Sequence, residues 1–171
     1  MKIGNISLIA PSHYPHEHWS EAEVLGSLMW LWQYVPSLKD APLSYLMTRV
    51  VPYIQHKQFV VCVENGRVIG YVSWAFLNNE TEKKYIQSQG LPLSINESNS
   101  GDRLWIIDWF SPFGRSKTMK NLVAQQLFPK NGMRSLYHRG RETGLRVMTF
   151  KGDLMSEQDF NDWQNKYALA E

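Results

Sequence analysis

Residues 59–77, FVVCVENGRVIGYVSWAFL, carry the clearest local pattern in the chain and decide its fold class. Two runs rich in apolar and β-branched residues flank the dipeptide Asn65-Gly66. This dipeptide favours a type I′ turn, because both central residues of that turn need positive φ angles. The stretch therefore predicts a hairpin of two antiparallel strands.

Helical patterns precede this hairpin. The segment 20–36 predicts a helix, since Ser20 and Glu23 have the spacing of a capping box and apolar residues recur at helical intervals. A second helix is expected from 42 to 55, where Pro52 would kink or shorten it. Both helices have apolar sides that need a sheet or another helix to pack against.

Further strands and helices are expected after the hairpin. Their order predicts an α+β fold in one domain, with a mostly antiparallel central sheet flanked by helices. We divide the chain into an N-terminal extension, residues 1–19, and a domain, residues 20–171. The expected elements are a helix at 80–89, a strand at 100–110, a helix at 116–128, strands at 134–140 and 145–150, and a last helix that starts at Ser156.

Composition and charge limit the function. The single cysteine, Cys62, excludes an intramolecular disulfide and is expected to be a small buried apolar residue. No stretch is long enough to cross a membrane, so we expect a reducing cytoplasm. The net charge is +2, yet Arg115 to Lys151 holds nine Lys or Arg and one acid, Glu142. This stretch predicts an acidic partner, or a solvated face whose acidic neighbours lie elsewhere.

The stretch SGDRLWIIDWF, residues 100–110, places an acid in an apolar strand. Strict alternation would put Asp108 on one face with three apolar residues, Leu104, Ile106 and Phe110. An isolated buried charge is very costly, so the carboxylate must be paired, hydrogen-bonded or protonated. Two interpretations stay open: a group for proton transfer, or a structural acid tied to Arg103, Arg115 or backbone amides.

Three blocks of the chain have distinctive motifs: SGDRLWIIDWFSPFG at 100–114, EVLGSLMWLWQYVP at 23–36, and residues 50–86. They resemble, in this order, the signature, the first helix and the central block of one bacterial family, the RTX toxin-activating lysine acyltransferases. The resemblance implies a fold like that of the N-acetyltransferases (GNAT). It also implies transfer of a fatty acyl group from acyl carrier protein to internal lysines of an RTX protoxin.

The resemblance sets further expectations about partners. We expect acyl carrier protein and an RTX protoxin as partners, with acyl-acyl carrier protein as the donor. We expect no bound cofactor, no metal, no nucleic acid and no stable membrane insertion. A homodimer is one assembly that the resemblance suggests, in the bacterial cytoplasm. The chain also lacks a Gly-rich pyrophosphate loop, which agrees with a donor other than coenzyme A.

The resemblance also implies site residues. The family's catalytic Asp falls on Asp108, but its catalytic His falls on Leu38. Three explanations stay open. His13, His16 or His18 could fold back over the site; Asp108 could suffice with help from Ser37 or Tyr85; or the chain could be a catalytically reduced relative that binds acyl carrier protein or toxin without turnover. The expected substrate-binding residues are Gly26, Trp30, Trp32, Tyr71, Ser73, Trp74, Arg103 and Trp109.

Overall fold

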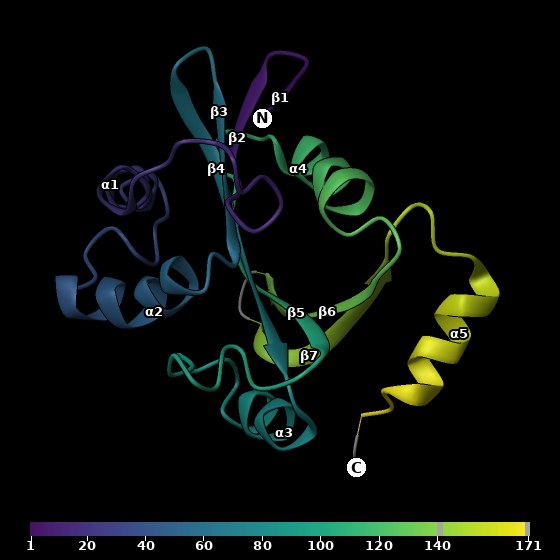
Figure 1. The fold of residues 1–171 in the computed structure, drawn as a ribbon. Coiled ribbons are helices and arrows are strands. Elements are labelled where there is room, and N and C mark those ends of the chain that lie inside the picture. The colour runs from purple at the N-terminus through teal and green to yellow at the C-terminus, as the bar shows by residue number, and fades with distance from the viewer. Residues whose placement is uncertain (140–141, 170–171) are drawn as a thin grey trace.

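A seven-stranded sheet runs through the molecule, and its strands lie side by side in chain order (Figure 1). The computed structural model describes residues 1–139 and 142–169. Neighbouring strands are antiparallel except β5 and β6, which are parallel. The strands are β1 (Lys2–Ile3), β2 (Ile6–Ile9), β3 (Phe59–Glu64), β4 (Arg67–Leu77), β5 (Arg103–Phe110), β6 (Gly132–Arg139) and β7 (Glu142–Lys151).

Helices cover both faces of this sheet, which confirms the α+β expectation. In Figure 1, α1 and α2 lie on one side of the central strands and α4 lies on the other. The helices are α1 (Glu21–Trp32), α2 (Leu43–Gln55), α3 (Asn79–Gln87), α4 (Ser116–Leu122) with its π-helical continuation η1 (Val123–Leu127), and α5 (Glu157–Lys166). No helix formed by the described residues is long and apolar enough to cross a membrane.

The predicted hairpin is confirmed as β3 and β4. Asn65 and Gly66 have φ angles of 51° and 75°, which are the positive values that their turn requires. Side chains from these strands enter two separate cores, one on each face. Val60 packs on the α4 face, whereas Val61 packs on the face covered by α1 and α2. Burial on both faces explains why the two strands are apolar throughout.

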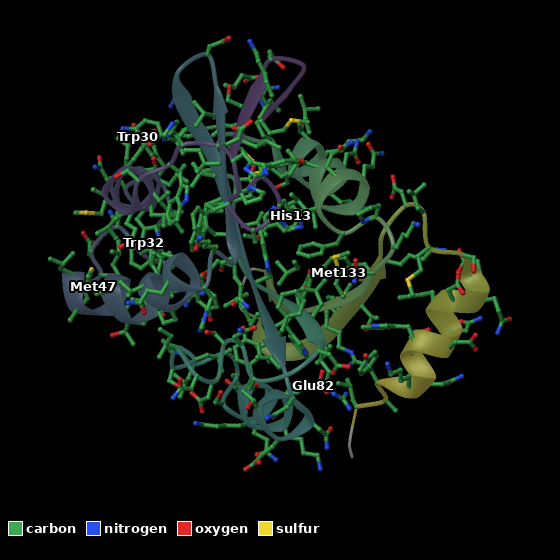
Figure 2. All side chains as sticks on the ribbon, viewed as in Figure 1. His13, Trp30, Trp32, Met47, Glu82 and Met133 are labelled. Carbon is green, nitrogen blue, oxygen red and sulfur yellow. The ribbon has the colours of Figure 1, made fainter. Side chains whose placement is uncertain are left out.

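The N-terminal residues belong to the sheet. β2 pairs with β3 along its whole length, and its residues Ile6 and Leu8 are buried. His13 lies on the α4 face (Figure 2), where its ring meets Trp74 and its Nε2 donates to the Leu127 carbonyl oxygen at 2.9 Å. Residues 6–9 and His13 of the expected N-terminal extension therefore pack on the sheet.

Some helix details also differ from the sequence expectations. Ser20 occupies the N-cap of α1, but its side chain makes no cap hydrogen bond. Ser156 does cap α5, because its hydroxyl accepts from the Asp159 amide at 3.0 Å. Pro52 lies inside α2 without shortening it, since the helix continues to Gln55.

Candidate active site

A change of register within β5 decides where Asp108 points. Ser73 of β4 pairs with Asp108, but the next residue, Trp74, pairs with Ile106. Ile107 is therefore an extra residue without a partner, which is the pattern of a β-bulge. Because of this extra residue, Asp108 lies with Ser73 on the face that α1 and α2 cover, while Ile106 lies with Trp74 on the α4 face.

The strict alternation expected from the sequence is thus wrong for this strand. Phe110 does share a face with Asp108, and its ring stacks on Tyr71 with the centroids 6.1 Å apart. Leu104 and Ile106 pack in the core on the opposite face. Bulges occur often beside active sites, where they redirect a side chain. Here the bulge turns the carboxylate toward helix α2.

The Asp108 carboxylate is buried, and its two oxygens make three polar contacts with two side chains, Arg49 and Ser73. Its side chain has 0% exposure. Oδ1 accepts from Arg49 Nε at 2.7 Å and lies 2.6 Å from Arg49 Nη2, while Oδ2 accepts from the Ser73 hydroxyl at 3.0 Å. The Asp108 amide in turn donates to the Ser73 oxygen at 3.2 Å. An ion pair with further hydrogen bonds is the arrangement that a buried carboxylate requires.

Arg49 connects this carboxylate to a tyrosine on the same helix. Its Nη1 donates to the Tyr45 hydroxyl at 2.8 Å, and its side chain is 21% exposed. The charge of Asp108 is the main cause that raises the pKa of Arg49 above its ordinary value. The guanidinium therefore stays charged at any working pH. Tyr45 and Arg49 lie four residues apart, which places both on one face of α2.

The arginines that the sequence offered as partners of Asp108 lie elsewhere. Arg103 donates to Glu82 at 2.6 Å, and Arg115 donates to Glu64 at 2.7 Å. An arginine does pair with Asp108, as the structural interpretation predicted. The residue is Arg49, however, and not Arg103 or Arg115. Sequence reasoning missed Arg49, although an arginine in the apolar run of α2 was a signal that could have found it.

The basic stretch of 115–151 is not one uniform surface. Arg115 pairs with Glu64, and Arg134 is buried against Glu82 at 2.8 Å. Lys151 pairs with Glu157 at 2.6 Å. The side chains of Arg139 and Arg141 lie outside the described residues. Acidic neighbours from other parts of the chain thus pair with three of the nine basic residues in this stretch, which agrees in part with the interpretation of a stretch balanced elsewhere in space.

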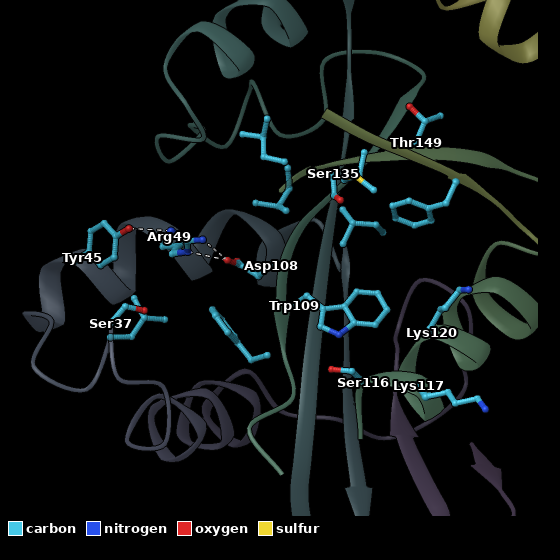
Figure 3. A pocket seen from close by; sticks show the side chains of 17 residues that line it. Ser37, Tyr45, Arg49, Asp108, Trp109, Ser116, Lys117, Lys120, Ser135 and Thr149 are labelled. Atoms are coloured by element: carbon cyan, nitrogen blue, oxygen red, sulfur yellow. Dashed lines mark hydrogen bonds and ion pairs between the residues drawn. The ribbon is translucent and has the colours of Figure 1, made fainter. Parts of the chain in front are cut away.

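A cavity opens where β5 and β6 diverge. Within the described strands, β5 and β6 pair only at Trp105 with Arg134 and at Ile106 with Ser135. Beyond these pairs lies a cavity of about 1000 Å³, shown in Figure 3. Its volume is at the upper end of the range for small-molecule sites. The lining residues are Ser37, Leu38, Tyr45, Arg49, 106–110, Ser116, Lys117, Lys120, Ser135, Leu136 and 148–150.

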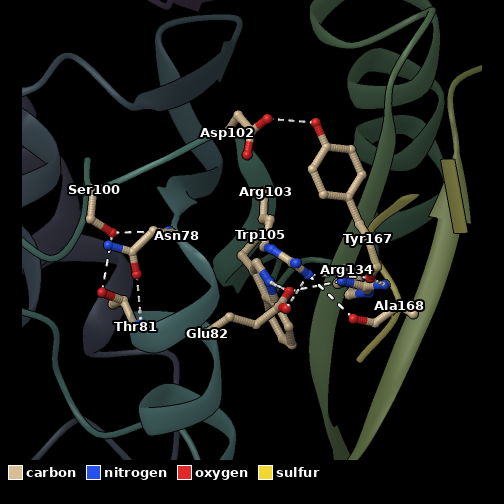
Figure 4. A network of polar contacts seen from close by, with 10 residues as sticks. All are labelled: Asn78, Thr81, Glu82, Ser100, Asp102, Arg103, Trp105, Arg134, Tyr167 and Ala168. Atoms are coloured by element: carbon tan, nitrogen blue, oxygen red, sulfur yellow. Dashed lines mark hydrogen bonds and ion pairs between the residues drawn. The ribbon is translucent and has the colours of Figure 1, made fainter. Parts of the chain in front are cut away.

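A buried glutamate fixes the point from which the strands diverge (Figure 4). Glu82 Oε1 accepts from Trp105 Nε1 at 2.7 Å and from Arg134 Nη1 at 2.8 Å. Trp105 and Arg134 form one of the two pairs that join β5 to β6, so Glu82 ties both strands to α3. Arg103 and Arg134 also donate to the carbonyl oxygen of Tyr167, just after α5. The network thereby anchors the C-terminal helix to the same junction.

The structure brings only part of the expected site together. Three of the expected site residues line the cavity, Ser37, Asp108 and Trp109, together with Leu38 at the position expected for the family histidine. Ser73 contacts the site through its hydrogen bond to Asp108. Trp32 and Tyr71 pack around Phe110 beside the site.

The other expected residues lie away from the cavity. Tyr85 is buried against Trp105, so its expected catalytic help has no support in this geometry. Trp74 packs on the α4 face, Arg103 binds Glu82, and Gly26 is exposed on α1. Trp30 packs against Phe113.

Leu38 stands where the resemblance placed the family histidine, and none of the described side chains that line the cavity replaces it. Among the described side chains that line the cavity there is no imidazole and no thiol. His13 lies on the opposite face of the sheet, and His18 lines a separate hollow near the N-terminus. Of the three explanations left open, the one in which an N-terminal histidine folds back over the site is therefore wrong for His13 and His18. Cys62 is buried, and burial raises the pKa of its thiol to about 12.

Fold and site together define a class of protein. A mostly antiparallel sheet, with one diverging parallel pair that opens onto a cavity, is consistent with the GNAT-like transferases. Within that class, the chain belongs to the RTX toxin acyltransferase family, whose model matches residues 17–151. This match confirms the resemblance inferred from the sequence blocks.

Curated relatives agree with the family assignment. The chain is 36% identical over 153 residues to the leukotoxin-activating lysine-acyltransferase of Mannheimia haemolytica serotype A1, covering 86% of this chain and 90% of that protein. It is 35% identical to the RTX-II toxin-activating lysine-acyltransferase of Actinobacillus pleuropneumoniae, covering 81% and 86%. It is 38% identical to a protein-lysine myristoyltransferase of Kingella kingae, covering 74% and 83%.

Proposed function

We propose that this protein transfers a fatty acyl group from the thioester of acyl carrier protein to internal lysines of an RTX protoxin, which activates the toxin. Family membership and the names of the relatives support acyl transfer to a toxin lysine. The observation that carries the proposal is the cavity between β5 and β6 with Asp108 in its wall. The bacterial cytoplasm, where acyl carrier protein is available, is the proposed location.

Asp108 supplies the negative charge that the lysine needs. It is the one carboxylate among the described residues that line the cavity. A lysine ammonium is attracted to it, loses a proton to it and becomes a nucleophilic amine. Arg49 makes both contacts to Oδ1, whereas Oδ2 accepts one hydrogen bond, from Ser73, and keeps a second lone pair for the ammonium proton. Ser37 lines the same cavity and can contribute a hydroxyl hydrogen bond.

Acyl carrier protein is the proposed donor because it is acidic and the cavity has a basic side. Lys117 and Lys120 of α4 are exposed and line the cavity opposite Arg49 (Figure 3). Exposed lysines attract an acidic partner and raise its rate of association at low salt. The donor's acyl chain would lie along the apolar part of the lining, which includes Trp109, Leu136 and Phe150.

Acyl transfer is favoured over the alternative of a catalytically reduced relative that only binds acyl carrier protein or toxin. Leu38 does line the cavity, so the position expected for the family histidine faces the site. The relatives are nevertheless named as transferases, and this chain keeps both the cavity and its carboxylate. The paired residues of the basic stretch give no added support for binding nucleic acid.

The test is a reconstituted reaction. The protein is mixed with acyl carrier protein bearing a myristoyl thioester and with a fragment of the leukotoxin on which the Mannheimia relative is named as acting. The expected result is a lysine carrying the mass of one acyl group, which is lost with Asp108→Asn. A folded protein that adds no acyl group, while the Mannheimia enzyme works in parallel, contradicts the proposal.

A further inference from the structure

The cavity contains a second group that can exchange a proton. Of the described side chains in its wall, the lysines Lys117 and Lys120 lie on the α4 side. On the α2 side, the groups that can take up or release a proton besides the guanidinium are Asp108 and Tyr45. Asp108 is the proposed acceptor for the lysine substrate. The role of Tyr45 is not explained by packing alone, because its side chain is only partly buried.

The hydrogen bond to Tyr45 determines where its proton points. Its hydroxyl oxygen accepts from Arg49 Nη1 at 2.8 Å. A phenol hydroxyl can accept and donate at the same time, so its own proton is directed away from the guanidinium. Among the hydrogen bonds described for this structure, the Tyr45 hydroxyl donates none. Figure 3 shows the hydroxyl on the cavity side of α2, next to Arg49.

The surroundings of Tyr45 keep the hydroxyl in place. The ring packs against Trp32 with the centroids 6.1 Å apart, and Arg49 lies 5.9 Å from the ring centroid. Arg49 is itself held by the two contacts to Asp108 at 2.7 and 2.6 Å. Asp108, Arg49 and Tyr45 therefore form one connected chain of charge-assisted hydrogen bonds. A guanidinium beside the phenol oxygen also stabilises negative charge that forms there during proton transfer.

We propose that Tyr45 is a catalytic proton donor of this enzyme, which protonates the thiolate that leaves the acyl thioester, and that Arg49 is its positioning residue. The inference rests on the proposed function and adds a residue to it. It also assigns Arg49 two tasks, because one guanidinium holds the hydroxyl on one side and the carboxylate on the other.

The proposed step balances in atoms and charge. The lysine ammonium gives one proton to Asp108, which later releases it to solvent, and the amine nitrogen forms a bond to the thioester carbon. The carbon–sulfur bond then breaks, and the leaving sulfur takes the Tyr45 proton. The nitrogen of the new amide gives its second proton to the Tyr45 oxygen. The products are an amide, a thiol and one released proton.

The first test compares two conservative variants in the acyl-transfer reaction. Tyr45→Phe keeps the ring and removes the hydroxyl, so kcat is expected to fall about 100-fold or more while KM changes little. The matched control is Tyr34→Phe, an exposed tyrosine that packs on Trp30 and Phe113 outside the cavity. It should react like the wild type. A Tyr45→Phe enzyme with wild-type kcat overturns the inference.

A second measurement separates a chemical role from a structural one. A thiophenyl ester of the same fatty acid is an acyl donor whose thiolate leaves without needing a proton. Tyr45→Phe should therefore lose about 100-fold in kcat with the thioester of acyl carrier protein and far less with the thiophenyl ester. An equal loss with both donors overturns the inference. If the wild type transfers no acyl group, the proposed function itself is overturned. If the wild type is active and Tyr45→Phe transfers acyl groups at the same rate, only the role of Tyr45 is overturned.

Discussion

Removing the guanidinium that holds Asp108 should destabilise the protein more than removing the carboxylate. Arg49→Met leaves a fully buried carboxylate with only the Ser73 hydroxyl as partner, and loss of one member of a buried pair costs about 3–5 kcal/mol. Asp108→Asn removes a charge-assisted pair but leaves Arg49, which is 21% exposed and can reach water. Its expected cost is about 1.5–3 kcal/mol.

The double variant tests the reasoning directly. When Arg49→Met and Asp108→Asn are combined, no uncompensated charge remains. The double variant should therefore lose about 1–3 kcal/mol less free energy of unfolding than the losses of the two single variants added together. Urea unfolding gives the free energies of unfolding of the wild type, the two single variants and the double variant. The comparison uses the midpoints and requires an unchanged m value. The control is Arg67→Met, which removes a guanidinium that lies over the rings of Trp30 and Phe113. Its expected cost is about 0.5–1 kcal/mol. The reasoning is refuted if the losses of the two single variants add up to that of the double variant. It is also refuted if Arg49→Met loses no more free energy of unfolding than Arg67→Met.

Three further predictions follow from buried groups elsewhere. Glu82→Ala leaves Arg134 buried without its partner and should lower the free energy of unfolding by about 3–5 kcal/mol in urea, whereas wild-type stability would contradict the network. Desolvation lowers the pKa of His13 below 6.5, so the unfolded chain binds more protons and stability should fall as pH drops below about 6.5. His13→Gln should flatten this dependence between pH 7.5 and 5.5, and parallel curves would contradict the assignment. Cys62, whose thiol pKa is about 12, should react with a thiol reagent only after unfolding, and rapid labelling of the native protein would show that the site is open.

Local sequence signals were sufficient for most of the framework. Asn65-Gly66 specifies its turn through backbone conformations that few other residues adopt, and the structure shows those conformations. The apolar run around Asp108 correctly predicted a buried strand inside the sheet. The strands β1 and β2 escaped detection because segments of two and four residues are too short to show a periodic pattern.

The features that sequence reasoning missed depend on distant parts of the chain. The bulge at Ile107 arises from pairing with β4, so alternation within β5 alone wrongly placed Leu104 and Ile106 on the face of Asp108. Arg49 and Asp108 are 59 residues apart in sequence, so the apolar surroundings of Arg49 mark it as unusual but do not show that Asp108 is its partner. The family resemblance located Asp108, but only the packing of α2 on the sheet brings Tyr45 into the site.

The central claim is that the cavity between β5 and β6 receives the acyl chain beside Asp108. The most direct test is photolabelling with acyl carrier protein that bears a fatty acyl thioester with a diazirine in its chain. After irradiation and proteolysis, the account predicts label on peptides that contain residues 106–110, 135–136 or 148–150, which line the cavity. The central claim would be contradicted if an active enzyme carried label only on peptides from α1 or α3 while the cavity peptides stayed unmodified.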